Sequence, residues 1–397
     1  MAKALNILQI VPSISLVYGG PSQMVRGLSR ALARQDAQVT VLTTDSNGDE
    51  GQAPLEVPLK EPIETDGYRT IYFRCAPFRR YKFSLPLLQW LSRHGADYDI
   101  AHIHALFSPV TSAAATVARL QKLPYILRPL GTLDPADLAK KKQFKQLYAA
   151  LLERPNIKGA AALHFTSEQE AKVSERFGVS TRDVVLPLGV ELPTFTCSDA
   201  DAQQQIRQRY SIPDGVPIVL FMSRIDPKKG LDLLLPALES LQQSGKQFHF
   251  VMSGGNPQDQ GYVNRIKQQI NNSVLQDCTT LTGFVSGDLK TQILQAADLF
   301  VLPSYYENFG IAVAEAMMAG KPVIISDQVH IWRDIKTSQS GWVTQCKQPA
   351  LVQSLAEAFN NPAERHQRGE NGRLFAQGNY GWDAIATRML ATYHQLL

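Results

Sequence analysis

Two glutamates, Glu307 and Glu315, frame the predicted start of a helix within YYENFGIAVAEAMMAGKPV, residues 305–323. Gly310 opens this run, Ala and Met fill it, and Gly320 with the proline that follows shortly after it would end it. A helix N-terminus can bind phosphates, and carboxylates beside it can bind hydroxyls. The spacing therefore favours a phosphorylated, hydroxyl-rich ligand.

The first backbone N–H groups of this helix would form an anion site, because they have no partner inside the helix and lie at the positive end of its dipole. The residues expected to line this loop are Ser304, Asn308, Phe309, Gly310 and Ile311. No residue three or four positions from Glu315 can neutralise its carboxylate, so its charge needs solvent or a ligand. A solvated helix face is the alternative, since Glu is usually exposed.

Two cations follow the strand expected at PIVLFMSR, residues 217–224. Arg224 ends that run, and Lys229 stands immediately before Gly230, which opens the next helix. At the carboxyl edge of a parallel strand, such a pair can hold both phosphates of a diphosphate and replace a metal ion. An exposed Arg and Lys without a ligand is the alternative.

A glycine pair, Gly19 and Gly20, follows the first expected strand and precedes Pro21 at a helix start. Glycines let the backbone pass close to a ligand. The pattern is not G-x-G-x-x-G, which disfavours NAD. A glycine pair is common in any such turn, so ligand contact and a plain turn both stay open.

The segment PSYYENFGIAVAEAMMAGKPVI, residues 303–324, resembles the retaining glycosyltransferases of family 4, whose members carry two Glu with seven residues between them in this setting. Their SR-x-x-x-x-KG segment is present too, with Arg224 and Lys229. The resemblance implies that these two cations stabilise a leaving nucleoside diphosphate. We expect Glu307 to orient the sugar and Glu315 to hold the ribose. The family also places a glycine loop such as the first one beside the donor phosphates.

Two histidines, His102 and His104, lie two positions apart in the expected strand DIAHIHAL and therefore face the same side of it. His104 is nearer the carboxyl edge, where ligands bind. The resemblance implies that His104 reaches the donor sugar, whereas a structural role is the alternative for His102.

Further contacts are expected on three other loops. Arg128, Gly131 and Asp134 in RPLGTLDP follow another strand and suit hydroxyl or phosphate contacts on the acceptor side. The resemblance implies that donor-binding backbone near Gly254, Phe284 and Val285 includes the contact to the nucleobase edge.

No metal site is predicted. The histidine pair lacks further zinc ligands nearby, and the four cysteines, Cys75, Cys197, Cys278 and Cys346, lie far apart. Asp199 and Asp201 mimic the D-x-D metal motif of another glycosyltransferase fold, but their place before a helical run favours N-capping. Scattered cysteines also indicate a reducing cytoplasm.

The order of expected elements predicts an α/β fold. Strands alternate with helices in both halves of the 397 residues, which indicates two doubly wound parallel domains. The resemblance implies GT-B architecture, two facing Rossmann-like domains with a last helix that crosses back to the first. We place the acceptor-side domain at residues 1–190 with 378–397, and the nucleotide-sugar domain at 191–377.

Composition is that of a soluble globular protein, with 44% hydrophobic and 19% charged residues and no apolar run long enough to span a bilayer. The N-terminal apolar stretch is interrupted by polar residues and is interpreted as a buried strand, not a signal peptide.

The basic excess lies in the first half, where residues 1–195 hold 23 Lys and Arg against 18 Asp and Glu. Two clusters supply much of it, one with Arg79, Arg80 and Lys82 and the other with Lys140 to Lys142. Such clusters favour an anionic membrane surface, with a solvated basic face as the alternative. No nucleic-acid motif is present, so nucleic acid is not expected as a partner.

Together these features predict a retaining, metal-independent glycosyltransferase without a cofactor. It would move a hexose from a nucleotide-diphosphate sugar, a UDP-sugar such as UDP-glucose favoured over a GDP-sugar, to a glycan or lipid-linked acceptor in exopolysaccharide or lipopolysaccharide synthesis. It would act in the cytoplasm or peripherally on the inner face of the membrane. A nucleotide-sugar epimerase of the same architecture and a non-catalytic nucleotide-sugar-binding scaffold are the alternatives.

Overall fold

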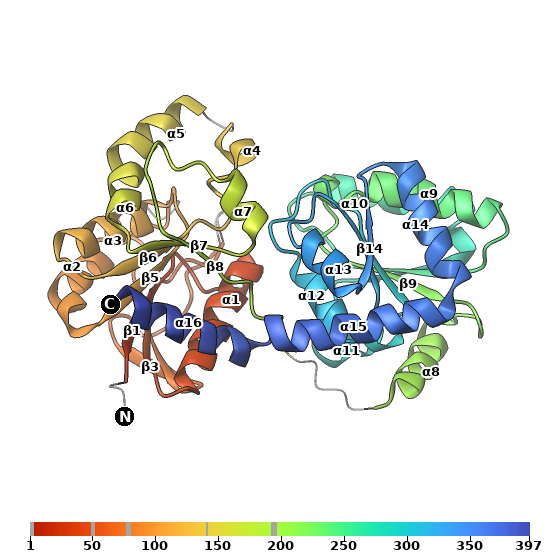
Figure 1. Ribbon diagram of the computed structural model, residues 1–397, viewed down its shortest axis with the longest axis horizontal. Helices are drawn as coiled ribbons and strands as arrows, with labels where there is room; N and C mark the ends of the chain where they lie inside the picture. Colours follow the sequence, from red (N-terminus) through yellow and green to blue (C-terminus); the bar gives the residue numbers. More distant parts are fainter. Residues whose placement is uncertain (1–3, 49–51, 77–80, 140–141, 192–196) are drawn as a thin grey trace. The chain divides into compact units, whose positions relative to one another are not determined.

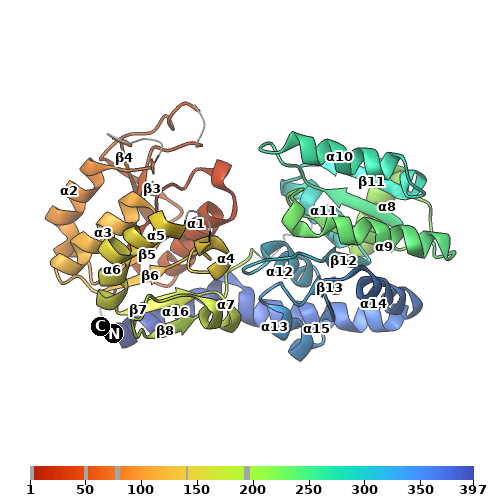
Figure 2. The same ribbon diagram turned by 90° about the horizontal axis from the view of Figure 1, so that it is seen from above.

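The computed structural model describes residues 4–48, 52–76, 81–139, 142–191 and 197–397. The chain divides into two compact units, one formed by Met1–Gly189 with Trp382–Leu397 and the other by Val190–Gly381. In each unit, helices cover both faces of one largely parallel sheet (Figure 1, Figure 2). The predicted fold class of two Rossmann-like α/β domains is confirmed.

The sheet of the first unit has, within the described residues, eight strands in the order β3-β4-β2-β1-β5-β6-β7-β8. They are β1 (Asn6–Ile10), β2 (Gln38–Thr44), β3 (Pro62–Thr65), β4 (Tyr68–Phe73), β5 (Ile100–His104), β6 (Tyr125–Arg128), β7 (Ala162–Phe165) and β8 (Asp183–Val185). Among the strands that the structure describes here, only β3 and β4 pair antiparallel, through a turn at Asp66 and Gly67, both with positive φ. A two-residue hairpin turn needs this conformation. The sequence-based prediction lacks this hairpin.

The helices of the first unit are η1 (Leu16–Tyr18), α1 (Gly20–Ala33), α2 (Leu85–His94), η3 (Gly95–Asp97), α3 (Pro109–Leu120), α4 (Pro135–Leu138), α5 (Lys142–Tyr148), the π-helix η4 (Ala149–Glu153), α6 (Arg154–Gly159), α7 (Glu168–Val173) and α16 (Trp382–Leu396). The C-terminal helix α16, dark blue in Figure 1, lies beside α1. Its Ile385, Met389 and Tyr393 are buried in the same core as Val25 and Leu28 of α1. The chain therefore returns to the first unit, as predicted.

The second unit has a six-stranded sheet in the order β11-β10-β9-β12-β13-β14 across its described residues, with every neighbouring pair parallel. Its strands are β9 (Ile218–Met222), β10 (His249–Ser253), β11 (Thr279–Gly283), β12 (Leu299–Leu302), β13 (Val323–Ser326) and β14 (Gly341–Thr344). Its helices are α8 (Asp199–Tyr210), η5 (Pro227–Lys229), α9 (Leu231–Gln243), α10 (Gln260–Asn271), η6 (Gln276–Cys278), α11 (Gly287–Ala296), α12 (Ile311–Met318), α13 (Trp332–Ser338), α14 (Gln348–Asn360) and α15 (Pro362–Tyr380). Five of these strands are almost wholly buried, as expected for a sheet covered on both faces, whereas the edge strand β11 is only partly buried.

Candidate active site

The carboxyl edge of the second sheet gathers predicted residues from four strands. Arg224 follows β9, Gly254 follows β10, Phe284 follows β11 and Ser304 follows β12. Because these strands are adjacent and parallel, their carboxyl ends lie at one edge. Gly254 has a φ of 145°, and a Cβ there would collide with the carbonyl of Ser223. The backbone after β10 therefore packs closely against the loop that carries Arg224.

Two loops at this edge are tied together through Tyr305. Its backbone N–H donates to the Lys228 carbonyl at 2.8 Å, and its hydroxyl donates to Asp232 at 2.7 Å. Asp226 caps the short helix η5 between them, because its side chain accepts from the Lys228 N–H at 3.0 Å. These bonds fix the position of Lys229 relative to the loop after β12.

Lys229 forms an ion pair with Glu307, in which its Nζ donates to Oε2. The side chains are 13% and 21% exposed. Glu307 is also held through its backbone, which donates to the Gln328 carbonyl at 3.2 Å and accepts from the His330 N–H at 3.0 Å. The structure thus brings together two of the four residues predicted to be catalytic, in a pair that is partly open to solvent.

The helix that follows Glu307 begins as the sequence predicts. Gly310, with a φ of 84°, is the N-cap of α12, and in the described chain no side chain caps this end and no acid lies in its first turn. Its left-handed conformation favours glycine. The first N–H groups of α12 are therefore available to an anion.

Neighbouring residues of this loop are packed into the unit. Phe309 is 2% exposed and its ring lies 5.2 Å from that of Tyr380. Ser304 is fully buried, and its Oγ has no hydrogen-bond partner among the described residues. Ile311, the first residue of α12, is partly buried, as is Asn308.

Glu315 differs from the expectation that only solvent or a ligand balances its charge. Lys290 of α11 donates to Glu315 Oε1 at 2.6 Å, and the two side chains are 31% and 20% exposed. Sequence reasoning missed Lys290 because it is 25 residues away on another helix. The ribose role of Glu315 remains a prediction, now with a lysine next to the carboxylate.

Of the two cations predicted to bind phosphate, Arg224 is the more exposed. Its Nη2 lies 3.5 Å from Asp226, and its side chain is 54% exposed. Phe284 is 83% exposed, whereas Val285, its neighbour, is buried. Phe284 is thus an aromatic ring in solvent at the edge where a nucleobase contact was predicted.

In the first unit, His104 ends β5 and is fully buried, as is His102. Burial lowers the pKa of both well below the usual value, with a further contribution to His104 from the nearby Arg128. Their rings stack with centroids 4.4 Å apart. Both histidines are therefore neutral, which suits hydrogen bonding and not charge pairing.

The loop after His104 is strained. Ala105 and Phe107 have φ values of 75° and 56°, a conformation that non-glycine residues rarely adopt. The buried carboxylate of Glu153, at the end of the π-helix, accepts from the Phe107 N–H at 2.6 Å and the Ser112 hydroxyl at 2.6 Å. No sequence pattern pointed to this anchor.

The predicted acceptor-side residues fall into two kinds. Arg128 lies at the end of β6 and not in the loop after it, is 1% exposed and donates to Met24 Sδ, and its acceptor-side contact stays a prediction. Burial lowers its pKa to about 10. Gly131, partly buried, and Asp134, 9% exposed, form the following turn.

Glu170 holds that turn in place. Its carboxylate accepts from the Gly131 N–H at 3.1 Å and from the Thr166 N–H and hydroxyl, each at 2.7 Å. Ser167 is the N-cap of α7 and accepts from the Glu170 N–H at 3.1 Å. The carboxylate of Glu170, however, serves the loop and not the reciprocal half of a capping box.

Gly19 and Gly20 lie where β1 leads into α1. Gly19, with a φ of 67°, is the N-cap of this helix, and no side chain of the described residues caps it. Before it, Leu16 and Val17 of η1 are 59% and 61% exposed.

Part of the basic clusters lies outside the described residues, namely Arg79, Arg80, Lys140 and Lys141. Lys142 begins α5. Lys82 is described, and its Nζ lies 4.4 Å above the ring of Tyr18. This places the 81–82 segment beside η1, where Tyr81 is 59% exposed.

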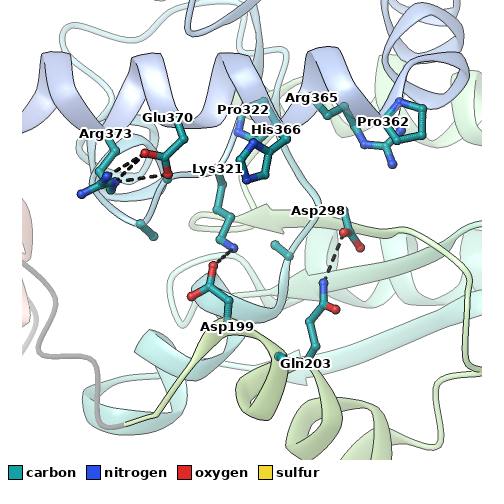
Figure 3. A pocket seen from close by; sticks show the side chains of 14 residues that line it. Asp199, Gln203, Asp298, Lys321, Pro322, Pro362, Arg365, His366, Glu370 and Arg373 are labelled. Carbon is teal, nitrogen blue, oxygen red and sulfur yellow. Dashed lines mark hydrogen bonds and ion pairs between the residues drawn. The ribbon is translucent and has the colours of Figure 1, made fainter.

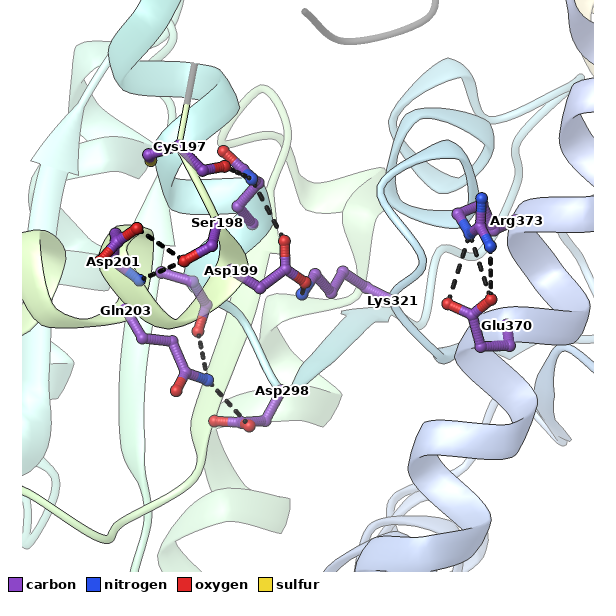
Figure 4. Close-up of polar contacts among 11 residues, drawn as sticks. Cys197, Ser198, Asp199, Asp201, Gln203, Asp298, Lys321, Glu370 and Arg373 are labelled. Carbon is purple, nitrogen blue, oxygen red and sulfur yellow. Dashed lines mark hydrogen bonds and ion pairs between the residues drawn. The ribbon is translucent and has the colours of Figure 1, made fainter. Parts of the chain in front are cut away.

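A pocket of about 550 Å³ lies at the other edge of the second sheet, before β12 and β13 (Figure 3). Lys321, 7% exposed, pairs with Asp199 at 2.8 Å, and Arg373 pairs with Glu370 at 2.6 Å. Figure 4 shows that Ser198 caps α8, accepting from the Asp201 N–H at 3.2 Å. The two aspartates therefore lie in the first turn and are not themselves the N-cap, which corrects the prediction.

Two features are absent from the residues that the structure describes. No group of three or more His, Cys, Asp or Glu there is placed to hold a metal ion. No helix there has both the length and the apolar character of a membrane span.

Comparison with known proteins identifies the family to which the chain belongs. A model of the glycosyl transferases group 1 family matches residues 202–375, and a model of the glycosyl transferase 4-like domain matches residues 19–189. Fold and matched regions together define a two-domain GT-B glycosyltransferase. The chain belongs to the group 1 glycosyltransferases of family 4, and it is an enzyme.

Similar proteins agree with this assignment. A D-inositol 3-phosphate glycosyltransferase of Xylanimonas cellulosilytica is 26% identical over 393 residues, covering 95% of this chain and 92% of that protein. The putative teichuronic acid biosynthesis glycosyltransferase TuaC of Bacillus subtilis is 31% identical over 288 residues, covering 71% and 65%. Neither protein supports the epimerase alternative.

Solved structures share the fold. Sucrose-phosphate synthase from Thermosynechococcus elongatus has a TM-score of 0.77 at 24% identity, covering 99% of each chain. Anabaena HepE, solved with UDP and glucose, has a TM-score of 0.73 at 18% identity, covering 98% of this chain and 99% of that chain.

Proposed function

We propose that this enzyme is a retaining, metal-independent hexosyltransferase that uses a nucleotide-diphosphate sugar, with UDP-sugars favoured over GDP-sugars. The acceptor is a glycan or a lipid-linked sugar, in the synthesis of an exopolysaccharide or lipopolysaccharide. The name of TuaC and the UDP complexes of HepE support a polysaccharide role and a uridine donor.

The ion pair of Lys229 with Glu307 beside the uncapped start of α12 is the observation that carries the proposal. A lysine and free helix N–H groups at one loop suit phosphate oxygens. The pair is partly exposed, so a diphosphate can replace Glu307 as the partner of Lys229. Glu307 is then released toward the sugar.

The chemistry assigned to these groups is a same-face substitution. The bond from the anomeric carbon to the phosphate oxygen breaks, the bond to the acceptor oxygen forms, and the acceptor proton passes to the departing diphosphate. Arg224, Lys229 and the N–H groups of α12 stabilise the growing charge on that diphosphate. No metal or cofactor is needed in this scheme.

His104 of the first unit is assigned to a hydroxyl of the transferred sugar. In the second unit, Glu315 is assigned to the ribose. Its contact with Lys290 at 2.6 Å holds the carboxylate in position for that purpose.

A membrane-facing surface is proposed for the first unit. Leu16, Val17 and Tyr81 are exposed beside Lys82, so apolar and basic groups occur together. Sedimentation with phosphatidylglycerol vesicles should fall when Lys82→Glu is combined with Leu16→Ser. Lys267→Glu, at an exposed position of α10, is the charge-matched control. Equal losses for both variants would reject this surface.

The test of the reaction is a transfer assay with UDP-glucose, other UDP-hexoses and GDP-mannose on alkyl glycoside acceptors, in the presence of EDTA. We expect diphosphate release from one nucleotide series and an α-linked product, read from the anomeric proton coupling. Inverted stereochemistry, or activity lost in EDTA and restored by Mn²⁺, would refute the proposed mechanism.

A further inference from the structure

A continuous run of hydrogen bonds crosses the core of the first unit and links α16 to β1, β5 and β7. Its members are Gln9, His102, His104, His164 and Tyr393, which we call the histidine relay. All five are at most 2% exposed. The bonds join His104 Nε2 to Gln9 Oε1 (2.6 Å), Gln9 Nε2 to the Tyr393 hydroxyl (3.2 Å), that hydroxyl to His102 Nδ1 (2.8 Å), His102 Nε2 to His164 Nδ1 (3.2 Å), and His164 Nε2 to the Leu186 carbonyl (2.9 Å).

The carbonyl of Leu186 sets the direction of this run, because a carbonyl oxygen can only accept. His164 must therefore carry its proton on Nε2, which leaves Nδ1 as an acceptor for His102 Nε2–H. A neutral imidazole donates from one nitrogen and accepts at the other. His102 Nδ1 must then accept from the hydroxyl of Tyr393.

The same logic continues to His104. The Tyr393 hydroxyl has given its proton to His102, so it accepts from the amide N–H of Gln9. The Gln9 oxygen is then turned to His104 and accepts from Nε2–H. Each of the three histidines is thus the Nε2–H tautomer, and His104 Nδ1 is left as a bare acceptor.

That nitrogen is unsatisfied. His104 Nδ1 is buried and has no hydrogen-bond partner among the described residues. Arg128 Nε, a donor, is buried and unpartnered in the same way. His104 and Arg128 are paired in register at the carboxyl ends of β5 and β6, so their side chains leave the sheet on the same face.

An unsatisfied acceptor and an unsatisfied donor on neighbouring strands define the chemistry of a ligand group. A hydroxyl can donate to His104 Nδ1 and accept from Arg128 Nε, whereas a carbonyl or an ammonium can do only one of these. Leaving a buried donor and a buried acceptor without partners destabilises the free site, so a hydroxyl that bonds both atoms removes that cost.

We propose that the histidine relay holds His104 as the acceptor for a ligand hydroxyl, and that Tyr393 is a positioning residue acting through it. The C-terminal helix then contributes to the site without touching the ligand. The relay stands on the geometry of the free chain, while the identification of the hydroxyl as that of the donor sugar rests on the proposed function.

The experiment is ¹⁵N NMR of the full chain labelled at histidine, in which long-range correlations report the nitrogen that carries the proton. At pH 7.5 we expect Nε2–H for His102, His104 and His164 in the wild type. Tyr393→Phe should replace the single His104 form by a mixture, because Gln9 loses the acceptor that fixes its amide. Tyr125→Phe is the matched control, since it removes a buried hydroxyl that bonds the Asn156 carbonyl at 2.6 Å, outside the relay.

Kinetics separate positioning from general damage. Tyr393→Phe should raise the KM for the sugar donor about tenfold with no change in the Kd for UDP, and Tyr125→Phe should alter neither. A change in the ¹⁵N chemical shift of His104 Nδ1 on adding UDP-glucose, but not on adding UDP, assigns the hydroxyl to the sugar. If neither compound changes this chemical shift, the hydroxyl is that of bound water and not of the ligand. A wild-type His104 protonated on Nδ1, or one unaffected by Tyr393→Phe, would overturn the relay, whatever the outcome of the transfer assay.

Discussion

The two units use polar side chains in opposite ways. At the carboxyl edge of the second sheet the polar groups are charged, paired and partly exposed, as in Lys229 with Glu307 and Lys290 with Glu315. In the histidine relay of the first unit they are neutral, wholly buried and arranged in one direction. Exposed ion pairs contribute little to stability and can exchange a partner for a ligand. Buried neutral networks fix geometry and cannot accept charge without loss of stability.

Acidification should give the largest difference in stability between the two units. Burial lowers the pKa of His164 to about 3 and those of His102 and His104 well below the usual value, whereas in the second unit it lowers that of His249 to about 4. Unfolded histidines bind protons below about pH 6.5 while these folded ones do not, so stability is lost as the pH falls from there.

From pH 7.5 to 5.5 each such histidine removes about 1.4 kcal/mol, hence up to about 4 kcal/mol for the first unit and about 1.4 for the second. Glu153, whose pKa burial raises, offsets part of the loss in the first unit. Hydrogen exchange of β5 and β9 at the two pH values measures both. Equal losses in the two strands would contradict the assignment of neutral buried histidines.

Removing the lysine of the charged pair should have the next largest effect. Lys229→Ala is expected to lower kcat by about 10²- to 10³-fold, because the charge that develops on the diphosphate loses a nearby cation. The adjacent and exposed Lys228 provides the control, and Lys228→Ala should change kcat less than about twofold. Steady-state transfer assays measure kcat for both variants. A similar loss of kcat in both would mean that the positive charge of this segment matters and not the specific position of Lys229.

Neutralising the acid of that pair sharpens the distinction between binding and chemistry. Glu307→Gln should reduce transfer about 10²-fold, while the Kd for UDP stays the same or falls, since Lys229 no longer has a competing carboxylate. Glu357→Gln, on the exposed face of α14, is the control. The assignment is wrong if Glu307→Gln weakens UDP binding and leaves kcat intact.

The second ion pair should give the smallest effect. Glu315→Ala is expected to weaken UDP binding about tenfold, the value of a hydrogen bond from a charged group to a ribose hydroxyl, and Lys290→Ala about threefold. With a dideoxyribose analogue of UDP, the penalty of Glu315→Ala should vanish. A penalty that persists with the analogue would place the ribose elsewhere.

Local signals in the sequence predicted the fold and the charged edge. Hydrophobic strands, glycine punctuation and the spacing of Glu307 and Glu315 are read along the chain, and α12 begins at Gly310 as expected. The β3–β4 hairpin was missed although its Asp66-Gly67 turn is a recognised hairpin signal.

Contacts between distant segments could not be predicted in this way. Lys290 reaches Glu315 from another helix, and Arg128 is buried by packing that a strand pattern does not reveal. Gln9 and Tyr393 are 384 residues apart, yet together they set the tautomer of His104. These relations arise from tertiary structure, so the sequence identified His104 but not what orients it.

Titration of UDP and GDP into the wild type and the Lys229→Ala variant by isothermal calorimetry tests the central claim most directly. The account predicts one site per chain with a Kd below about 1 mM for one diphosphate, tighter for UDP, without added metal, and about tenfold or more weaker in Lys229→Ala. Absence of binding by both diphosphates, or equal affinity in the variant, would contradict a diphosphate site at this edge of the second unit.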